Sequence, residues 1–588
     1  MKNSFSIFSE FLSYAKPWRP KIIWASFYSI MNKIFDIAPE ILIGIYVDLV
    51  VTGDKSFIAK LGFESLESQI TLLAIATLLI WVSESTFEYL YSVQWKNIAQ
   101  GVEHDIRIDT YSHVQDLDLE WYEKQKTGNI TAILNDDVNQ LERFLNGGFN
   151  DILQIIISTI AIGAVFFYIS PLIALFAICP IPIILFVASF FQKKLSPKYL
   201  DVRNAAGNLS SSIFNNLLGI ITIKGFTAEQ YETQKILKMS ENYQNKNQDA
   251  IKLSSAFIPI VRMGVLTGFI GTMIIGTVYT IQGDIAVGSF SVLVFLTQRF
   301  LWPFTRLGET IDLFERSMAS TKRILELLKT KSKINNKKDA IKIDNLNKTI
   351  TFENVSFGYT DKPVFKNLNL QINKGDFIGI AGQTGAGKTT LIKLLFRFYE
   401  VGSGAIKFDN HNLNNINIQS LRSKIGLVNQ EIFLFDGTIK ENICYPHYDI
   451  DEALLMEVAS NSQCLEFIEK LPNGFDTIIG ERGQKLSVGQ KQRIGIARAL
   501  YKKPDILIFD EATSAVDNET EYLIQKALKE IAKHCTTIVI AHRLSTIKNS
   551  NKIIVLGDKN VSEQGSHDEL IENDNFYKQL WNIQTGNN

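Results

Sequence analysis

Three glycines precede a lysine and two threonines within the short segment 382–390. An apolar run, 377–381, predicts a strand before this segment, and residues 390–396 predict a helix after it. Glycines let backbone N–H groups turn toward a phosphate with no Cβ in the way, and the N-terminus of the helix adds partial positive charge. The segment therefore has the pattern of a nucleotide-binding P-loop. Its expected nucleotide contacts are Gly382, Gln383, Thr384, Gly385, Ala386, Gly387, Lys388, Thr389 and Thr390.

Two side chains of this loop and two acids further along the chain would supply the chemistry. Lys388 is placed to reach the β- and γ-phosphates, and the Thr389 hydroxyl to ligate Mg²⁺. Asp510 and Glu511 follow an apolar run, 506–509, which predicts a buried strand that ends where α/β sheets bind ligands. We expect Asp510 to ligate Mg²⁺ and Glu511 to act as general base toward the attacking water. Two surface acids after a core strand are the alternative, which the upstream P-loop disfavours.

The composition of the chain excludes several classes of protein. The 588 residues leave room for several domains, and a formal net charge of −1 at pH 7 gives no overall basic footprint for nucleic acid. Long apolar blocks crowd the first half, whereas the second half has the pattern of a soluble α/β domain. The cysteines are scattered without a C-x-x-C pair, which argues against a disulfide framework or a zinc site. They are Cys179, Cys444, Cys464 and Cys535.

The first half contains six long apolar segments, each able to cover the roughly 20 residues that cross a bilayer. The connections 95–147 and 193–252 are long, polar and helical in pattern, and they carry Lys and Arg where they leave the apolar zone. The positive-inside rule therefore places both termini and both long connections in the cytosol. The expected spans are 23–50, 69–94, 148–169, 171–192, 253–281 and 287–306.

These patterns divide the chain into parts. Residues 1–22 predict an amphipathic helix that lies in the membrane interface, with a plain solvated helix as the alternative. Residues 23–318 form the expected transmembrane domain, with two cytosolic coupling regions, and 319–348 form a basic, Asn-rich linker. In 349–588, strand patterns alternate with helical ones, which predicts a largely parallel sheet. The expected fold is a membrane α-helical bundle of six transmembrane helices with long cytosolic extensions, joined to an α/β P-loop NTPase domain.

The segment Leu486-Ser487-Val488-Gly489-Gln490 matches the signature motif of ABC transporters. With the P-loop and Asp510, it makes the chain resemble that family over essentially its whole length. Six spans fused to one C-terminal nucleotide-binding domain resemble the half-transporter exporters of multidrug and lipid-flippase type. The resemblance implies that Ser487, Gly489 and Gln490 contact the nucleotide. The family usually has glycine where Val488 stands, and the Ser487 hydroxyl and the Gly489 backbone would still face the γ-phosphate.

The same resemblance assigns further roles in the nucleotide site. Gln430 matches the Q-loop, a ligand of Mg²⁺ and of the attacking water, and Asp517 matches the D-loop. His542 matches the switch histidine that contacts the γ-phosphate, and Tyr359 matches the aromatic that stacks on adenine. The implied cofactors are ATP and Mg²⁺. The implied catalytic residues are Glu511, His542, Gln430 and Lys388, and the implied metal ligands are Thr389, Gln430 and Asp510.

Two segments of the long connections resemble the coupling helices of exporters, namely 121–128 and 219–226. The segment 481–483 resembles the stretch with which exporters touch the intracellular helices of the partner. The family often has Glu where Asn215 stands, so polar contacts there are expected to differ.

For function, the resemblance implies an ATP-driven exporter or flippase that moves hydrophobic or amphipathic compounds, drugs or lipids, by alternating access. Its place would be the plasma (bacterial inner) membrane. One signature motif cannot complete the site of its own P-loop, so a dimer is obligatory. The full motif set favours a homodimer over a heterodimer with another half-transporter. An importer and an ATP-gated channel or regulatory protein on the same scaffold remain open, whereas a soluble ABC ATPase would lack the spans.

Ionisable residues inside the predicted spans leave two interpretations open. Asp36 and Glu40 share one helix face in the first span, as do Glu84 and Glu88 in the second, and Arg299 lies in the sixth. Such groups are costly at membrane depth, so they pair between helices or face a watery cavity. In the first case they fix packing. In the second they line the path and favour amphipathic cations or the polar head of a lipid.

Overall fold

The structure is a computed structural model that describes residues 4–53, 56–447, 449–510, 518–541, 543–573 and 575–585. The chain divides into two compact units. The helical unit contains Met1–Gln115 and Thr127–Thr330, and the sheet unit contains Asp116–Lys126 and Lys331–Asn588. A short piece of the first long connection therefore belongs to the sheet unit.

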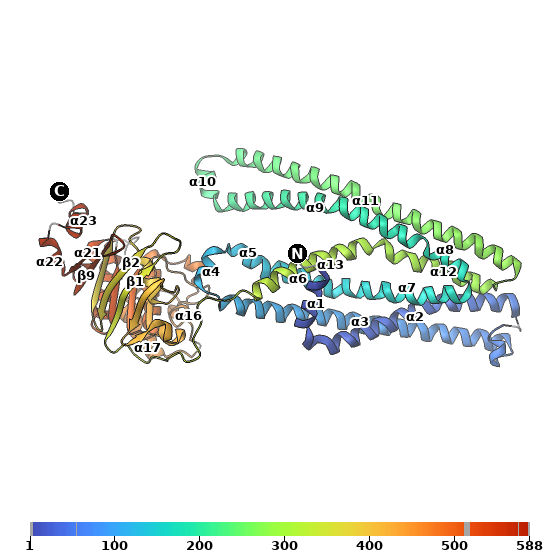
Figure 1. Ribbon diagram of the computed structural model, residues 1–588, viewed down its shortest axis with the longest axis horizontal. Helices are drawn as coiled ribbons and strands as arrows, with labels where there is room; N and C mark the ends of the chain where they lie inside the picture. The colour runs from blue at the N-terminus through green and yellow to red at the C-terminus, as the bar shows by residue number, and fades with distance from the viewer. Residues whose placement is uncertain are drawn as a thin grey trace. The chain divides into compact units, whose positions relative to one another are not determined.

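Long helices make up the helical unit, and α9 and α11 run along each other to the short α10 (Figure 1). Ser170 has an extended backbone between α7 and α8, and Pro171 starts α8, at the boundary between the predicted spans 148–169 and 171–192. The main helices are α2 (Arg19–Thr52), α3 (Leu66–Gln115), α5 (Thr127–Ala132), α6 (Val138–Arg143), α7 (Phe149–Ile169), α8 (Pro171–Ile178), α9 (Pro180–Leu218), α10 (Ile220–Gly225), α11 (Glu229–Gln282), α12 (Val287–Leu301) and α13 (Leu307–Leu328).

Five helical stretches of the described residues are long and apolar enough to cross a membrane. The predicted first span is α2, which is not among them, because Lys33, Asp36, Glu40 and Asp48 interrupt its apolar sequence. The total of six spans therefore stays a prediction. The five stretches are Leu66–Gln115, Thr127–Ile169, Pro171–Leu218, Glu229–Gln282 and Val287–Leu328.

The helices pack through apolar clusters and a few buried polar contacts. Ile37, Phe166 and Leu296 belong to one cluster that joins α2, α7 and α12. Ser29 Oγ donates to Asn150 Oδ1 at 2.7 Å and accepts from Trp95 Nε1 at 3.0 Å, which links α2, α3 and α7. These contacts give the helical unit its own core.

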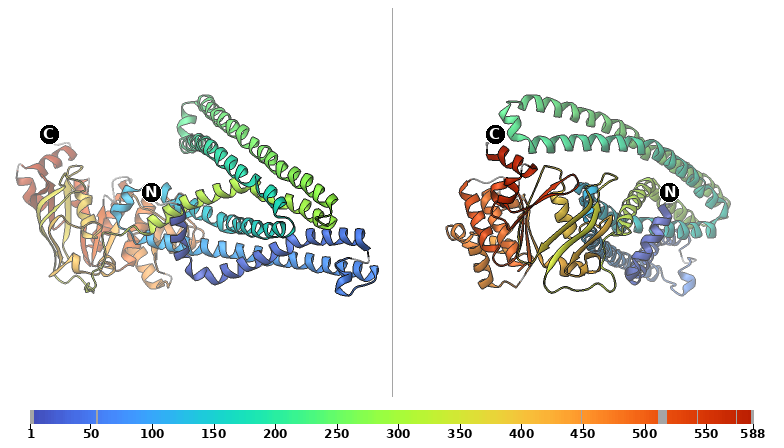
Figure 2. Two further views of the ribbon diagram at one scale, coloured as in Figure 1. Left: turned by 45° about the vertical axis from the view of Figure 1, so that its right-hand side comes forward. Right: turned by 60° about the vertical axis from the view of Figure 1, so that its left-hand side comes forward.

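The hairpin of α9, α10 and α11 departs from this packing. None of the residues between Ala205 and Ala250, all of which the structure describes, is buried. In Figure 2 the α10 end of the hairpin diverges from the remaining helices of the unit. Large apolar side chains are exposed there: Phe214 is 61% exposed, Leu217 66%, Leu218 71%, Ile221 84% and Phe226 80%.

The apolar face of the N-terminal helix α1 (Ser4–Tyr14) packs against other helices of the helical unit. Ile7 and Phe11 are buried in a cluster with residues of α3 and α13, among them Trp95 and Met318. Phe5, on another face, is 71% exposed. That residues 1–22 also lie in a membrane interface stays a prediction.

The sheet unit contains two sheets (Figure 1). The six-stranded sheet has the order β10-β9-β3-β8-β7-β6, in which β9, β3, β8, β7 and β6 are parallel and β10 is antiparallel. The four-stranded sheet, β2-β1-β4-β5, is antiparallel. The strands are β1 (Thr349–Phe357), β2 (Phe365–Asn373), β3 (Phe377–Gly382), β4 (Ser403–Phe408), β5 (His411–Asn412), β6 (Ile425–Val428), β7 (Ile506–Asp510), β8 (Thr536–Ile540), β9 (Lys552–Gly557) and β10 (Asn560–Gly565).

Helices complete the sheet unit. Phe352, Phe408 and Ile380 belong to a core cluster that the two sheets share, and Ile443, Leu455 and Ile494 form a separate helical core. The principal helices are α4 (Leu119–Lys124), α14 (Lys388–Leu395), α15 (Ile418–Ser423), α16 (Ile439–Ile443), α17 (Glu452–Asn461), α18 (Leu465–Glu469), α19 (Val488–Tyr501), α20 (Asn518–Ile531), α21 (Leu544–Ile547), α22 (His567–Glu572) and α23 (Phe576–Thr585).

Candidate nucleotide site and membrane cavity

The P-loop joins β3 to α14 and depends on its glycines. Gly385 has a φ of 86° and Gly387 a φ of 101°, a region that residues with a Cβ rarely adopt. A Cβ on Gly387 would lie 2.7 Å from the ring of Phe365, whereas a Cβ on Gly385 would meet nothing within 4 Å. The loop is therefore held tightly on one side and open on the other, which suits a cradle for phosphates.

Lys388 and Thr389 begin the helix that follows the loop. The Lys388 side chain is largely buried, and its Nζ donates to the carbonyl of Gly382 at 2.8 Å and to that of Gln383 at 3.3 Å. The ammonium group thus lies against the loop whose bound phosphates it is expected to contact. Thr389 is exposed at the N-terminus of α14, where its hydroxyl is accessible to a ligand.

The sheet brings the second part of the site to the same edge. Both β3 and β7 pair with β8 in parallel, and Ile540 lies opposite Ile380 on one side and Asp510 on the other. Asp510 therefore ends its strand level with the start of the P-loop, as the apolar run before it predicts. Gln430 follows the end of β6, and its carbonyl accepts from Gln492 Nε2 at 3.0 Å. Glu511, Asp517 and His542 lie outside the described residues, so their roles stay predictions.

The residues at this edge fit Mg²⁺. Thr389, Gln430 and Asp510 offer hydroxyl, amide and carboxylate oxygens, the ligand types that this ion prefers. They come from α14, the end of β6 and the end of β7, which the parallel sheet places along one edge. The donor set of the chain is thus consistent with a magnesium nucleotide.

The signature motif begins a helix rather than a loop. Ser487 is the N-cap of α19: its Oγ accepts from Gln490 N at 3.2 Å, and Gln490 Oε1 accepts from Ser487 N at 2.9 Å. Val488 is the first helical residue and is 52% exposed, so its branched side chain does not enter the core. The substitution of valine for the usual glycine therefore leaves the capped helix N-terminus intact.

Tyr359 lies beside the start of α14 and retains an accessible ring. Its Oη is 3.2 Å from Thr390 Oγ1, and its ring meets that of Tyr399 edge-on at a centroid distance of 5.1 Å. The residue is 43% exposed. A partly exposed ring next to the phosphate loop is suitable for stacking with a nucleotide base.

In the helical unit, the acids of the first span are paired. Asp36 binds Lys33 at 2.6 Å and also pairs with Arg299, and Glu40 pairs with the same arginine. Glu88 is exposed, and Glu84 is partly buried. The structure thus brings together Asp36, Glu40 and Arg299, which favours the packing interpretation for these residues.

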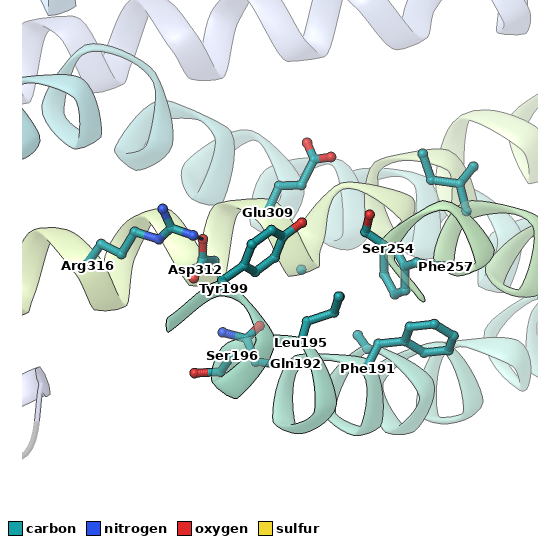
Figure 3. A pocket seen from close by; sticks show the side chains of 13 residues that line it. Phe191, Gln192, Leu195, Ser196, Tyr199, Ser254, Phe257, Glu309, Asp312 and Arg316 are labelled. Carbon is teal, nitrogen blue, oxygen red and sulfur yellow. Dashed lines mark ion pairs between the residues drawn. The ribbon is translucent and has the colours of Figure 1, made fainter. Parts of the chain in front are cut away.

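A cavity of about 190 Å³ lies elsewhere in this unit, between α9, α11 and α13 (Figure 3). Its apolar walls include Phe191 and Phe257, whose ring centroids are 5.5 Å apart. Glu309, Asp312 and Arg316 project from α13, and Asp312 pairs with Arg316 at 2.6 Å. Glu309 has no ion-pair partner within the described part of the chain. Sequence reasoning missed this cavity because its lining comes from segments that no motif connects.

Together, the fold and the site define a P-loop ATPase domain joined to a membrane domain of long helices. A family model described as the ABC transporter transmembrane region matches residues 22–304, and one described as ABC transporter matches residues 365–514. The chain belongs to the ABC transporter family. It is an ATP-binding and ATP-hydrolysing multi-pass membrane protein of the exporter and flippase type, as the sequence predicts.

Similar proteins support this assignment over nearly the full length. The ABC transporter ATP-binding protein YwjA of Bacillus subtilis (strain 168) is 32% identical over 98% of this chain and 99% of its own. The ATP-dependent lipid A-core flippase of Desulfotalea psychrophila is 32% identical over 91% of this chain and 94% of its own. A solved structure of a bacterial Atm1-family ABC exporter with ATP bound has a TM-score of 0.83 at 27% identity, covering 96% of this chain and 98% of that one.

Proposed function

We propose that two copies of this chain form an exporter that moves amphipathic compounds carrying a cationic group, driven by hydrolysis of ATP with Mg²⁺. The observation that carries the choice of cargo is the cavity between α9, α11 and α13. Aromatic and aliphatic walls favour an apolar body. Asp312 is balanced by Arg316, so Glu309 leaves one negative charge for a cation.

Each residue of the nucleotide site has its own role in the proposed binding and hydrolysis of ATP. The P-loop backbone and Lys388 bind the phosphates, and Tyr359 stacks on adenine. Thr389, Gln430 and Asp510 would hold Mg²⁺, which would supply positive charge toward the phosphate oxygens. Glu511 accepts the proton of the attacking water, and Gln430 and His542 orient that water and the γ-phosphate. Ser487, Gly489, Gln490 and Asp517 act on the nucleotide of the other copy.

The α9–α10–α11 hairpin supports a second copy as the partner. Its apolar side chains, including Ile221 at 84% and Phe226 at 80% exposure, have no cover within their own helical unit. An exposed apolar patch of this kind is typical of an interface. The chain carries every motif that a working site requires, so a homodimer needs no different half-transporter. The proposed location is the plasma membrane, with both termini in the cytosol.

Transport by the purified chain in proteoliposomes tests this proposal. With the nucleotide domains facing outward, ATP should drive a fluorescent amphipathic cation into the vesicle lumen, and a matched anionic dye should stay outside. Purified alone, the chain should hydrolyse ATP with positive cooperativity. Uptake of the anion instead of the cation would overturn the cargo assignment. Movement in the opposite direction would indicate an importer, and ATP-dependent flux only down a gradient would indicate a channel.

A further inference from the structure

A short helix of the first long connection contacts the nucleotide domain beside Tyr359. This helix, α4, belongs to the sheet unit, although the chain on both sides of it belongs to the helical unit. Asp118 caps α4 by accepting from Trp121 N at 3.0 Å, and it also accepts from Lys333 N at 2.7 Å. Leu119 packs on the core that the sheets share. The helix is therefore fixed to the nucleotide domain by apolar and polar contacts.

Glu123 of α4 bridges two side chains of the nucleotide domain. Its Oε1 lies 2.6 Å from Lys393 Nζ, and its Oε2 accepts from Tyr399 Oη at 2.5 Å. Burial acts against the charge on Glu123, but these two hydrogen bonds outweigh it and lower the pKa of the carboxyl group. The bridge is thus ionised at neutral pH.

Both residues that Glu123 holds are neighbours of Tyr359. Tyr399 meets the Tyr359 ring edge-on at 5.1 Å, and the ammonium group of Lys393 lies 5.3 Å from the centroid of the same ring. The Tyr359 hydroxyl also contacts Thr390, which lies in the first turn of α14, the helix that carries Lys393. The ring is therefore held by Tyr399 and by two side chains of α14, Thr390 and Lys393. Of these residues, α4 contacts Lys393 and Tyr399 through Glu123.

We propose that Glu123 is a positioning residue that sets the Tyr359 ring through Lys393 and Tyr399, so that docking of α4 raises the affinity of the site for an adenine nucleotide. Since coupling between two binding events is reciprocal, a nucleotide with a base also strengthens the hold on α4. In the proposed stacking role, the ring would contact the base rather than the triphosphate. The effect should therefore depend on the base. The inference rests on the proposed stacking role of Tyr359.

Equilibrium binding of a non-hydrolysable ATP analogue to the full-length chain in nanodiscs tests this inference. Glu123→Gln should raise the dissociation constant about fivefold and leave the affinity for inorganic tripolyphosphate, which lacks a base, unchanged. The matched control is Glu120→Gln on the same helix. Glu120 also pairs with two lysines, Lys124 at 2.5 Å and Lys333 at 2.7 Å. Among the described residues it forms no hydrogen bond or ion pair with Tyr359, Lys393 or Tyr399. This control should bind the analogue like the wild type.

A double-mutant cycle separates positioning from general support of the fold. In a Tyr359→Leu background, Glu123→Gln should have no further effect, because the ring through which it acts is gone. Additive losses, an equal loss of tripolyphosphate binding, or unchanged affinity in Glu123→Gln would overturn the role of Glu123. If Tyr359→Leu alone left analogue binding intact, the stacking role itself would fail, which is a distinguishable result.

Hydrogen exchange supplies a second readout, which can be measured without substituting Glu123. The amides of residues 119–124 should become more protected when the ATP analogue binds, and tripolyphosphate should give no such protection. The nucleotide-dependent protection should disappear in Tyr359→Leu. Equal protection by both ligands would show that the phosphates, rather than the base, communicate with α4, and would overturn the inference.

Discussion

The nucleotide site and the cavity of the helical unit are built in opposite ways. The first is formed largely by one continuous loop, in which Gly387 has a φ of 101° and a Cβ would collide with Phe365. The second is assembled from side chains of α9, α11 and α13, none of which has a required backbone conformation. A site made by backbone geometry restricts its sequence, whereas a site made by side-chain composition can change its ligand while the fold stays the same.

The strongest test of the backbone-built site concerns the proposed base. Glu511→Gln keeps the shape of the side chain but removes its basicity, so turnover should fall by about 10²–10⁴-fold. ATP should still bind, because the P-loop and Tyr359 are untouched, and a nucleotide-bound dimer should accumulate. Steady-state ATPase assays and size-exclusion chromatography with ATP measure both effects. Near-normal turnover in a preparation free of contaminating ATPases would contradict this assignment.

The corresponding test of the cavity concerns Glu309, the acid in its lining that has no ion-pair partner among the described residues. Glu309→Gln should weaken the apparent affinity for a transported amphipathic cation by about tenfold, read from substrate-stimulated ATPase, and should leave basal activity unchanged. Glu315→Gln, on the same helix but outside the cavity lining, is the matched control. If both variants respond to the cation like the wild type, the cavity does not bind the cargo through Glu309.

Much of the nucleotide site was predictable from sequence, because its elements are local. The predicted strand 377–381 corresponds to β3, Phe377–Gly382, and the predicted helix 390–396 overlaps α14, Lys388–Leu395. The apolar run before Asp510 corresponds to β7. The contact of Glu123 with Lys393 was not predictable, because it joins residues 270 positions apart through a helix with no distinctive periodicity. The cavity lining, from 188 to 316, was hidden for the same reason.

A charged residue in a predicted span can either fix the packing of the helices or line the transport path, and a substitution of Asp36 distinguishes these two roles. Asp36 pairs with Lys33 and Arg299, so we expect Asp36→Asn to lower the melting temperature by about 2–4 °C by leaving these cations with a weaker partner. Stimulation by the cation should stay normal. Thermal unfolding in detergent measures the loss, and Glu88→Gln, at an exposed position, is the control. Normal stability with lost stimulation would instead place Asp36 on the transport path.

The smallest expected effect tests whether the residue types of the signature motif or its backbone geometry determine its function. Val488→Gly restores the residue that the family usually has, at a position that is 52% exposed. The capping contacts between Ser487 and Gln490 use backbone groups and their own side chains, so they should persist. Glycine at the first turn weakens a helix by at most about 1 kcal/mol, and the ATPase rate should change by less than about threefold. Ser487→Ala, which removes the cap and the hydroxyl together, should lower the rate far more. A large gain from Val488→Gly would mean that the valine side chain obstructs the nucleotide of the partner copy.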